Sequence, residues 1–258
     1  MLLVVDIGNS NIVLAFFTSS EKSEYTIRRT ASETTQGAKI YTAIFTELFK
    51  SAELDPKKIS RAIISSVVPS LTGEVESAIK NIISCPIFLL NQSQYDKLPL
   101  TLPETARKEI GTDILANAVL AFYKYKKACI VVDFGTALTF VAVDSKACVR
   151  GVAIAPGLQT ACRALFSNTA QLPTVLLEEP ETSLGTDTVT AIQSGIVLGY
   201  KGLVTTMLAR MQQDLGEKCV CIATGGLSYI FKKEKNIFDE LDVGFTTRGM
   251  ALILEKFL

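Results

Sequence analysis

The sequence contains no histidine. This absence excludes Ser-His-Asp and Cys-His activation of a nucleophile, and it excludes zinc sites built on histidine. A general base in this protein must therefore be a carboxylate. Tryptophan is absent as well, but its absence excludes no class of function.

An excess of charge of one sign is also missing, because 26 Lys and Arg residues balance 26 Asp and Glu residues. No overall field favours nucleic acid or a membrane surface, so we expect a small-molecule partner. The first apolar run stops at Asp6, and no run reaches the roughly 18 residues that a membrane span needs. We expect a cytoplasmic protein.

The six cysteines are scattered through apolar stretches, and only Cys219 and Cys221 lie close together in the sequence. Cysteine packs readily as a small hydrophobic residue. We therefore expect buried free thiols rather than a disulfide framework or a zinc site.

The length of 258 residues, with 48% hydrophobic residues, is close to the size at which one core divides into two. We expect an N-terminal domain over residues 1–115 and a C-terminal domain over residues 116–258.

One pattern occurs twice in the chain. VVDIGNSNIVLAFF at residues 4–17 and VVDFGTALTFVAV at residues 131–143 each combine an apolar strand, an Asp-x-Gly turn and a second strand. Asp6 and Asp133 hold the same place in the two copies. The repeat predicts two similar α/β halves, each offering an acidic hairpin with a glycine to a shared cleft.

The patterns of apolar residues predict the remaining elements. Residues 91–108 are polar, contain two prolines and are expected to form a loop. Thr112 or Asp113 is expected to cap the helix that comes after this loop. The expected strands are 2–5, 12–17, 24–29, 61–67, 87–90, 129–133, 138–143, 149–155 and 219–223, and the expected helices are 36–52, 73–83, 114–125, 158–167, 188–214 and 227–232.

The two hairpins suit the binding of phosphate. Glycine lets backbone N–H groups approach an anion, and neighbouring Ser, Thr and Asn side chains add donors. Asp6 and Asp133 would repel phosphate unless a cation stands between them and the nucleotide. One Asp-x-Gly turn is more often an ordinary hairpin. Two in matching contexts, with a further strand running into Thr224, Gly225 and Gly226, favour a nucleotide site, in which the third turn would suit adenosine.

This arrangement resembles the superfamily of actin, Hsp70 and sugar kinases, in which two ribonuclease-H-like domains hold a nucleotide in the cleft between them. The order and spacing of the motifs are similar to those of the type III pantothenate kinases. The motifs that carry this resemblance are VDIGNSN, SSVVPSL, EIGTDILANA, VVDFGTALTF, IAPGLQT, LGTDTVTAIQSGIVLG and ATGG.

The resemblance implies ATP-dependent phosphorylation of pantothenate to 4'-phosphopantothenate, the first step of coenzyme A biosynthesis, by a homodimer that uses Mg²⁺ and K⁺ or NH₄⁺. It implies that Asp113 is the catalytic base, that Asp133 holds the monovalent cation and that Asp6 holds Mg²⁺ through water. The residues implied for ATP are Asp6, Ile7, Gly8, Asn9, Ser10, Asn11, Ile12, Val13, Thr136, Gly225 and Gly226, and those for the acceptor substrate are Gly111, Thr112, Asp113, Ile114 and Thr188.

The acceptor side departs from the family pattern. Ile114 stands where the pattern has Arg, and Glu104 stands where it has Tyr. The usual Thr-x-Asp-Glu after the second strand is replaced near Thr35, Gln36 and Gly37. Two alternatives therefore stay open: a nucleotide-binding regulatory or inactive homologue, and a kinase for another small alcohol. Asp113 could also serve only as a helix cap.

Overall fold

A computed structural model describes residues 1–18, 25–167, 175–234 and 236–258. The chain forms two compact units. Met1–Pro99, Glu104–Leu120 and Thr246–Leu258 make the first unit, and Leu100–Pro103 with Ala121–Phe245 make the second. These units differ from the expected domains 1–115 and 116–258 at residues 100–103, 116–120 and 246–258.

The first unit contains a five-stranded sheet in the order β3-β2-β1-β4-β5. Strand β1 pairs antiparallel with β2 and parallel with β4. The strands are β1 (Leu2–Ile7), β2 (Asn11–Phe17), β3 (Tyr25–Ala31), β4 (Arg61–Ser66) and β5 (Ile87–Leu89).

Alternation along these strands separates two faces. One face carries Leu3, Val5 and Ile7, which pack in a core with helices α1 (Ala38–Ser51) and α2 (Pro69–Lys80). Asp6 therefore lies on the opposite face of the sheet.

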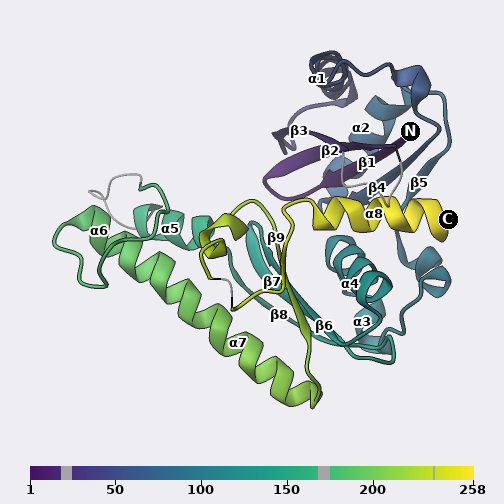
Figure 1. Cartoon of the computed structure of the whole chain (residues 1–258). Helices are drawn as coiled ribbons and strands as arrows, with labels where there is room; N and C mark the ends of the chain where they lie inside the picture. The colour runs from purple at the N-terminus through teal and green to yellow at the C-terminus, as the bar shows by residue number, and fades with distance from the viewer. Residues whose placement is uncertain (19–24, 168–174, 235) are drawn as a thin grey trace. The chain divides into compact units, whose positions relative to one another are not determined.

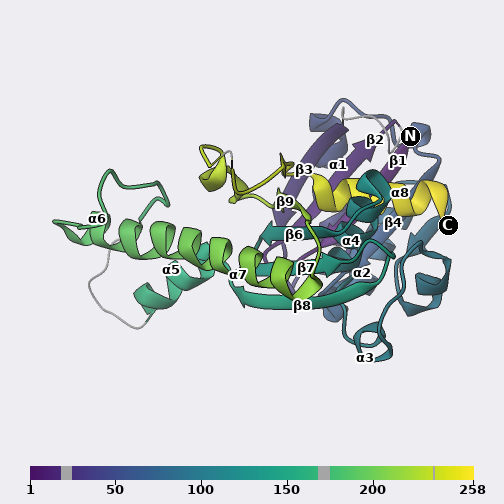
Figure 2. The same cartoon turned by 60° about the horizontal axis from the view of Figure 1, so that its bottom comes forward.

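Two further helices belong to the first unit. Helix α4 (Thr112–Tyr125) begins in it, and nearly all of helix α8 (Phe245–Lys256) belongs to it. In both views α8, in yellow, lies beside α4 and the purple strands of the first sheet (Figures 1 and 2). Their packing is tight, because a Cβ added at Gly249 would lie 2.3 Å from the carbonyl oxygen of Ala116.

The second unit repeats the sheet topology. Its strand order is β10-β9-β6-β7-β8, so in both sheets the first strand lies between its hairpin partner and the fourth strand. The expected duplication and the α/β class are confirmed. The strands are β6 (Cys129–Phe134), β7 (Ala137–Val143), β8 (Val149–Pro156), β9 (Val220–Thr224) and β10 (Glu240–Leu241).

Helices cover one face of the second sheet. Ile130, Val132 and Phe134 of β6 pack in a core with α5 (Leu158–Ser167) and α7 (Gly199–Leu215). Asp133 lies on the opposite face. Among the described residues no helix combines the length and apolar character required to cross a bilayer.

The cysteines behave largely as expected. Cys129, Cys162, Cys219 and Cys221 are buried, Cys85 and Cys148 are partly exposed, and all six are free thiols. Burial raises the pKa of the Cys129 thiol to about 12. Such thiols are poor nucleophiles near neutral pH.

Several elements differ from the sequence predictions. Helix α2 begins at Pro69 rather than at residue 73, because proline suits the first turn of a helix. The expected helix 188–214 consists of α6 (Thr188–Gln193), a π-helical turn (Ser194–Leu198) and α7, and the expected helix 227–232 is a 3₁₀ turn at Ser228–Phe231. The first residue of the expected strand 24–29 lies outside the described residues.

The sequence reasoning missed five elements, the first of which is the 3₁₀ turn η1 (Pro56–Lys58). The expected loop 91–108 contains a 3₁₀ turn, η2 (Gln92–Lys97), and a short helix, α3 (Glu104–Arg107), and strand β10 and helix α8 were not predicted. The prediction that Thr112 or Asp113 caps α4 is wrong. The helix begins at Thr112, and Asp113 lies inside its first turn.

Candidate active site

The first glycine hairpin joins β1 to β2. The Gly8 N–H donates to the carbonyl of Asn11 over 3.0 Å, and the Ser32 hydroxyl donates to the Gly8 carbonyl over 2.6 Å. These bonds fix the turn, while the side chains of Asn9, Ser10 and Asn11 are exposed. The turn therefore presents polar groups to solvent at the end of a buried strand, as a phosphate loop requires.

The second glycine hairpin joins β6 to β7 and is held by hydrogen bonds from the segment that follows β8. The carbonyl of Thr136 accepts hydrogen bonds from the Gly157 N–H over 3.0 Å and from the Thr160 hydroxyl over 2.7 Å. A Cβ added at Gly157 would lie 2.2 Å from the Gly135 carbonyl. Only glycine can therefore stand at residue 157 with the loop in this position.

The third turn follows β9 and packs on the second hairpin. Gly225 has a φ of +88°, and the Leu227 N–H donates to the Phe134 carbonyl over 3.4 Å. The Ser228 hydroxyl closes the turn by donating to the Gly225 carbonyl over 2.8 Å. Within the second unit, the structure thus brings Asp133, Thr136, Gly225 and Gly226 together at the carboxyl ends of β6 and β9.

Asp113 is partly buried in the first turn of α4. Its Oδ1 accepts a hydrogen bond from the Ile114 N–H over 2.8 Å. Burial raises the pKa of this carboxyl, and backbone hydrogen bonds oppose the shift only in part. A carboxylate that is costly to ionise is a better proton acceptor at neutral pH than an exposed one.

Gly111 makes room for this carboxylate. A Cβ at residue 111 would stand 2.4 Å from Asp113 Oδ1. The Gly-x-Asp spacing therefore has a steric cause: a side chain at residue 111 would displace the acid.

Tyr95 is a neighbour of Asp113 that the sequence reasoning missed. It is 4% exposed, and burial and then the negative charge of Asp113 raise its pKa. Tyr95 lies in η2, inside the segment expected to be a loop. The capping pattern of Asn91 and Gln94 was the signal that could have found this turn.

Ile114 and Glu104 take up different environments. Ile114 is 7% exposed, and Glu104 is exposed at the start of α3. Arg107, a basic residue close enough in sequence to replace the missing Arg, forms an ion pair with Asp96.

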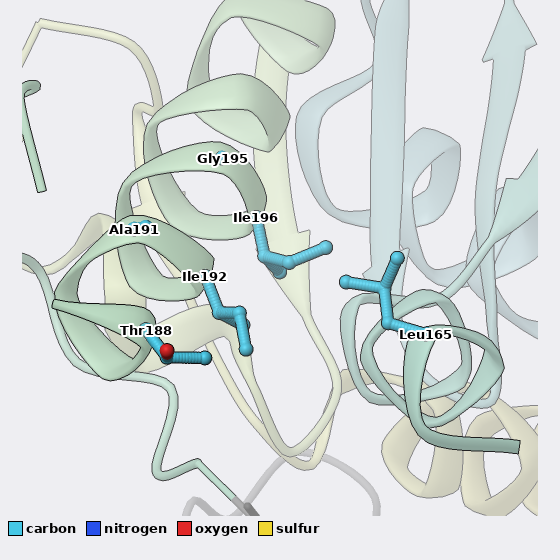
Figure 3. A pocket seen from close by; sticks show the side chains of 6 residues that line it. All are labelled: Leu165, Thr188, Ala191, Ile192, Gly195 and Ile196. Carbon is cyan, nitrogen blue, oxygen red and sulfur yellow. The ribbon is translucent and has the colours of Figure 1, made fainter. Parts of the chain in front are cut away.

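Thr188 lies at the first position of α6, in the second unit. It lines an apolar pocket of 430 Å³ together with Leu165, Ala191, Ile192, Gly195 and Ile196. Ile196 and Leu165 point toward each other across this pocket (Figure 3). Asp187 caps the helix by accepting from the Thr190 N–H over 2.9 Å.

A match to a protein-family model shows which family the chain belongs to. The model described as type III pantothenate kinase matches residues 2–210. The chain belongs to the type III pantothenate kinase family.

Relatives within this family match nearly the whole chain. A type III pantothenate kinase of Treponema pallidum is 40% identical over 98% of this chain and 93% of its own length. One from Syntrophus aciditrophicus is 36% identical and covers 99% of both chains.

A solved structure agrees in fold. A Sinorhizobium meliloti protein named as a 2-dehydro-3-deoxygalactonokinase superposes with a TM-score of 0.55 at 13% identity, covering 100% of this chain and 98% of the other. The fold is that of the actin-like ATPases and sugar kinases.

Proposed function

We propose that this protein transfers the γ-phosphoryl group of ATP to the terminal hydroxyl of pantothenate, the opening step of coenzyme A synthesis. Membership of the type III pantothenate kinase family supports the reaction. The observation that carries the proposal is the environment of Asp113, which combines a raised pKa with one oxygen fixed by the helix backbone.

Asp113 would accept the proton of the acceptor hydroxyl as the hydroxyl attacks phosphorus. Phosphoryl transfer depends mainly on positioning and on charge neutralisation, so the base has to be held in place rather than made strongly basic. The bond between Oδ1 and the Ile114 N–H holds one oxygen of the carboxylate. We expect Oδ2 to receive the proton.

The residues that would contact ATP are residues 6–13, Thr136, Gly225 and Gly226. The carboxylate oxygens of Asp6 and Asp133 suit the Mg²⁺ and K⁺ or NH₄⁺ ions that the family resemblance implies. Mg²⁺ keeps several water ligands and needs few carboxylates, which fits Asp6 beside an exposed glycine turn. Among the described residues no group of three acidic, Cys or His side chains could hold a metal. Asp6 would hold Mg²⁺ through water, and the ion would neutralise charge on the phosphates, while Asp133 would hold K⁺ or NH₄⁺.

A second candidate is a kinase for another small alcohol, or a homologue that binds nucleotide without turnover. The buried Ile114 favours it, because an arginine at this position could pair with a carboxylate substrate and isoleucine cannot.

A coupled assay for ADP tests the first proposal. Purified protein with ATP, Mg²⁺ and K⁺ should form ADP only after pantothenate is added. Calorimetry separates the candidates: ATP binding without saturable pantothenate binding would favour the second. Turnover of another alcohol in an acceptor panel would identify the substrate.

We further propose a cytoplasmic homodimer. The family resemblance and the exposed apolar side chains near α6, Leu165 at 41% and Val189 at 39% exposure, support this assembly. Light scattering should give twice the chain mass, and a monomer at assay concentrations would contradict it.

A further inference from the structure

Two buried hydroxyls join β4 to α4. Ser65 Oγ lies 2.7 Å from Thr112 Oγ1, and either atom can be the donor. Ser65 is 0% exposed and Thr112 is 8% exposed. A hydrogen bond is stronger in such low-dielectric surroundings, and losing one partner leaves the other hydroxyl unsatisfied.

Ser65 stands directly beside the first acidic hairpin. In the parallel pairing of β1 and β4, Asp6 is in register with Ser65, so both side chains lie on the same face of the sheet. This face is opposite to the one that packs on α1 and α2. The Ser65 hydroxyl is thus a direct link between the strand pair that carries Asp6 and the helix that carries Asp113.

The link acts on the turn that holds the base. Thr112 is the first residue of α4, and Asp113 follows it. Because Asp113 Oδ1 is bonded to the Ile114 N–H of the same turn, the carboxylate moves with that turn. The position of the carboxylate relative to β1 therefore depends on where the turn is fixed.

The second half of the chain provides an internal comparison. Thr224 on β9 is in register with Asp133, as Ser65 is with Asp6. The Thr224 hydroxyl donates over 3.5 Å to the carbonyl of Val243, ahead of α8. The duplicated fold thus places a buried hydroxyl at the same point twice. In the first half the hydroxyl of Ser65 bonds the side chain of Thr112, and the residue after Thr112 is Asp113.

We propose that Ser65 is a positioning residue for Asp113, acting through the hydroxyl of Thr112. The inference deepens the proposed function and rests on it. Ser65 itself touches neither nucleotide nor acceptor in this scheme. Its effect is to hold the first turn of α4 where the carboxylate meets the acceptor hydroxyl.

The experiment compares Ser65→Ala, Thr112→Val and the double variant with Thr46→Val. Thr46 is a matched control, because its hydroxyl donates to the Thr42 carbonyl within α1 of the same unit. Ser65→Ala and Thr112→Val should each lower kcat about 10- to 100-fold, since small displacements of a catalytic group have effects of this size. The KM for ATP should stay the same, and Thr46→Val should keep the wild-type kcat.

Coupling and rescue separate positioning from a general loss of stability. The double variant should lose no more kcat than the worse single variant, because both remove one interaction. Thr112→Ser keeps the hydroxyl and should keep most of the rate. Equal losses of kcat in Thr112→Ser and Thr112→Val, or multiplicative losses in the double variant, would overturn the proposal.

Amide hydrogen exchange gives a readout that does not need activity. Exchange at Ile114 and at Leu115, whose N–H donates to the Gly111 carbonyl over 3.0 Å, should become faster in Ser65→Ala and stay unchanged in Thr46→Val. Unchanged exchange in Ser65→Ala would overturn the proposal. If the wild-type protein does not phosphorylate pantothenate, the proposed function fails, and exchange alone decides whether Ser65 holds the turn.

Discussion

Gly225 lies against Asp133 so closely that a Cβ at residue 225 would stand 2.4 Å from the carboxylate oxygen Oδ1 and 2.7 Å from the Phe134 nitrogen. The third turn of the second unit is therefore built directly on the second acidic hairpin. Because Gly225 also has a φ of +88°, two separate constraints require glycine at this position.

We expect Gly225→Ala to lower the free energy of unfolding by about 2 to 4 kcal/mol, through backbone strain and overpacking. ATP binding should weaken as the turn moves away from Asp133. Urea unfolding and calorimetry measure the two effects. Gly202→Ala is the control with the opposite sign. Gly202 lies exposed inside α7 with nothing within 4 Å of an added Cβ, so alanine should stabilise the protein by about 0.5 to 1 kcal/mol.

Asp113→Asn should lower kcat by on the order of 10² to 10⁴, because the amide accepts no proton. A rate equal to wild type would remove the assigned role of Asp113.

The same substitution should stabilise the fold at neutral pH. Burial raises the pKa of Asp113 above the ordinary value of 3.8, so the folded protein binds this proton more tightly than the unfolded chain does. Ionisation therefore costs stability as the pH rises above 3.8. Thermal unfolding should show Asp113→Asn above wild type at pH 7, with a gap that closes as the pH falls toward that value. A constant gap at all pH values would contradict the linkage.

Lys201 of α7 joins two segments of the second unit. Its Nζ bonds Glu179 Oε1 over 2.6 Å and Glu234 Oε1 over 2.8 Å, and its side chain is 11% exposed. Burial lowers the pKa of Lys201, but the hydrogen bonds and charges of the two carboxylates outweigh it and raise the pKa overall. The ion pairs therefore stabilise the fold fully below the ordinary lysine pKa of 10.5, and this contribution is lost as the pH rises through the higher folded value.

Lys201→Met should lower the free energy of unfolding by about 1 to 2 kcal/mol at pH 7, since the glutamates are partly exposed and solvent screens them. Lys50→Met is the control. The exposed pair of Lys50 and Glu47 should contribute no more than about 0.5 kcal/mol. Equal losses of unfolding free energy in the two variants would show that the ion pairs of Lys201 contribute no more stability than an exposed pair.

Ile114→Arg tests whether the family arginine can be restored. Ile114 is 7% exposed, so an unpaired guanidinium there should cost about 3 to 5 kcal/mol of unfolding free energy. Ile114→Leu, the control, should cost less than about 1.5 kcal/mol. A stable arginine variant with a lower KM for pantothenate would show instead that this side chain reaches the acceptor.

The sequence predicted the central strands of both sheets because Val, Ile and Leu runs mark buried strands. It predicted the places of Asp6 and Asp133 because each belongs to a local Asp-x-Gly hairpin, whereas Asp113 lies inside the first turn of α4 rather than at its cap. The bond between Ser65 and Thr112 could not be predicted in this way, since it joins residues 47 positions apart and the local motif around each residue does not indicate its distant partner. Strand β10 could not be predicted because a strand of two residues is too short to show an alternation of apolar and polar side chains.

Helix α8 shows a different limit. Its apolar residues Ala251, Leu252, Ile253 and Leu254 are all buried, so it lacks the alternation between apolar and polar faces that identifies a surface helix. Where such a helix packs is decided by distant partners, here Ala116, rather than by its own sequence.

This packing orders events during synthesis on the ribosome. Residues 246–258 belong to the unit that also contains Met1–Pro99. The helix that packs beside the first sheet is therefore translated only after every residue of the second unit. The second unit, formed by residues 100–103 and 121–245, is complete earlier. A released fragment of residues 1–245 should therefore resist proteolysis in its second unit, while its first unit is cleaved readily.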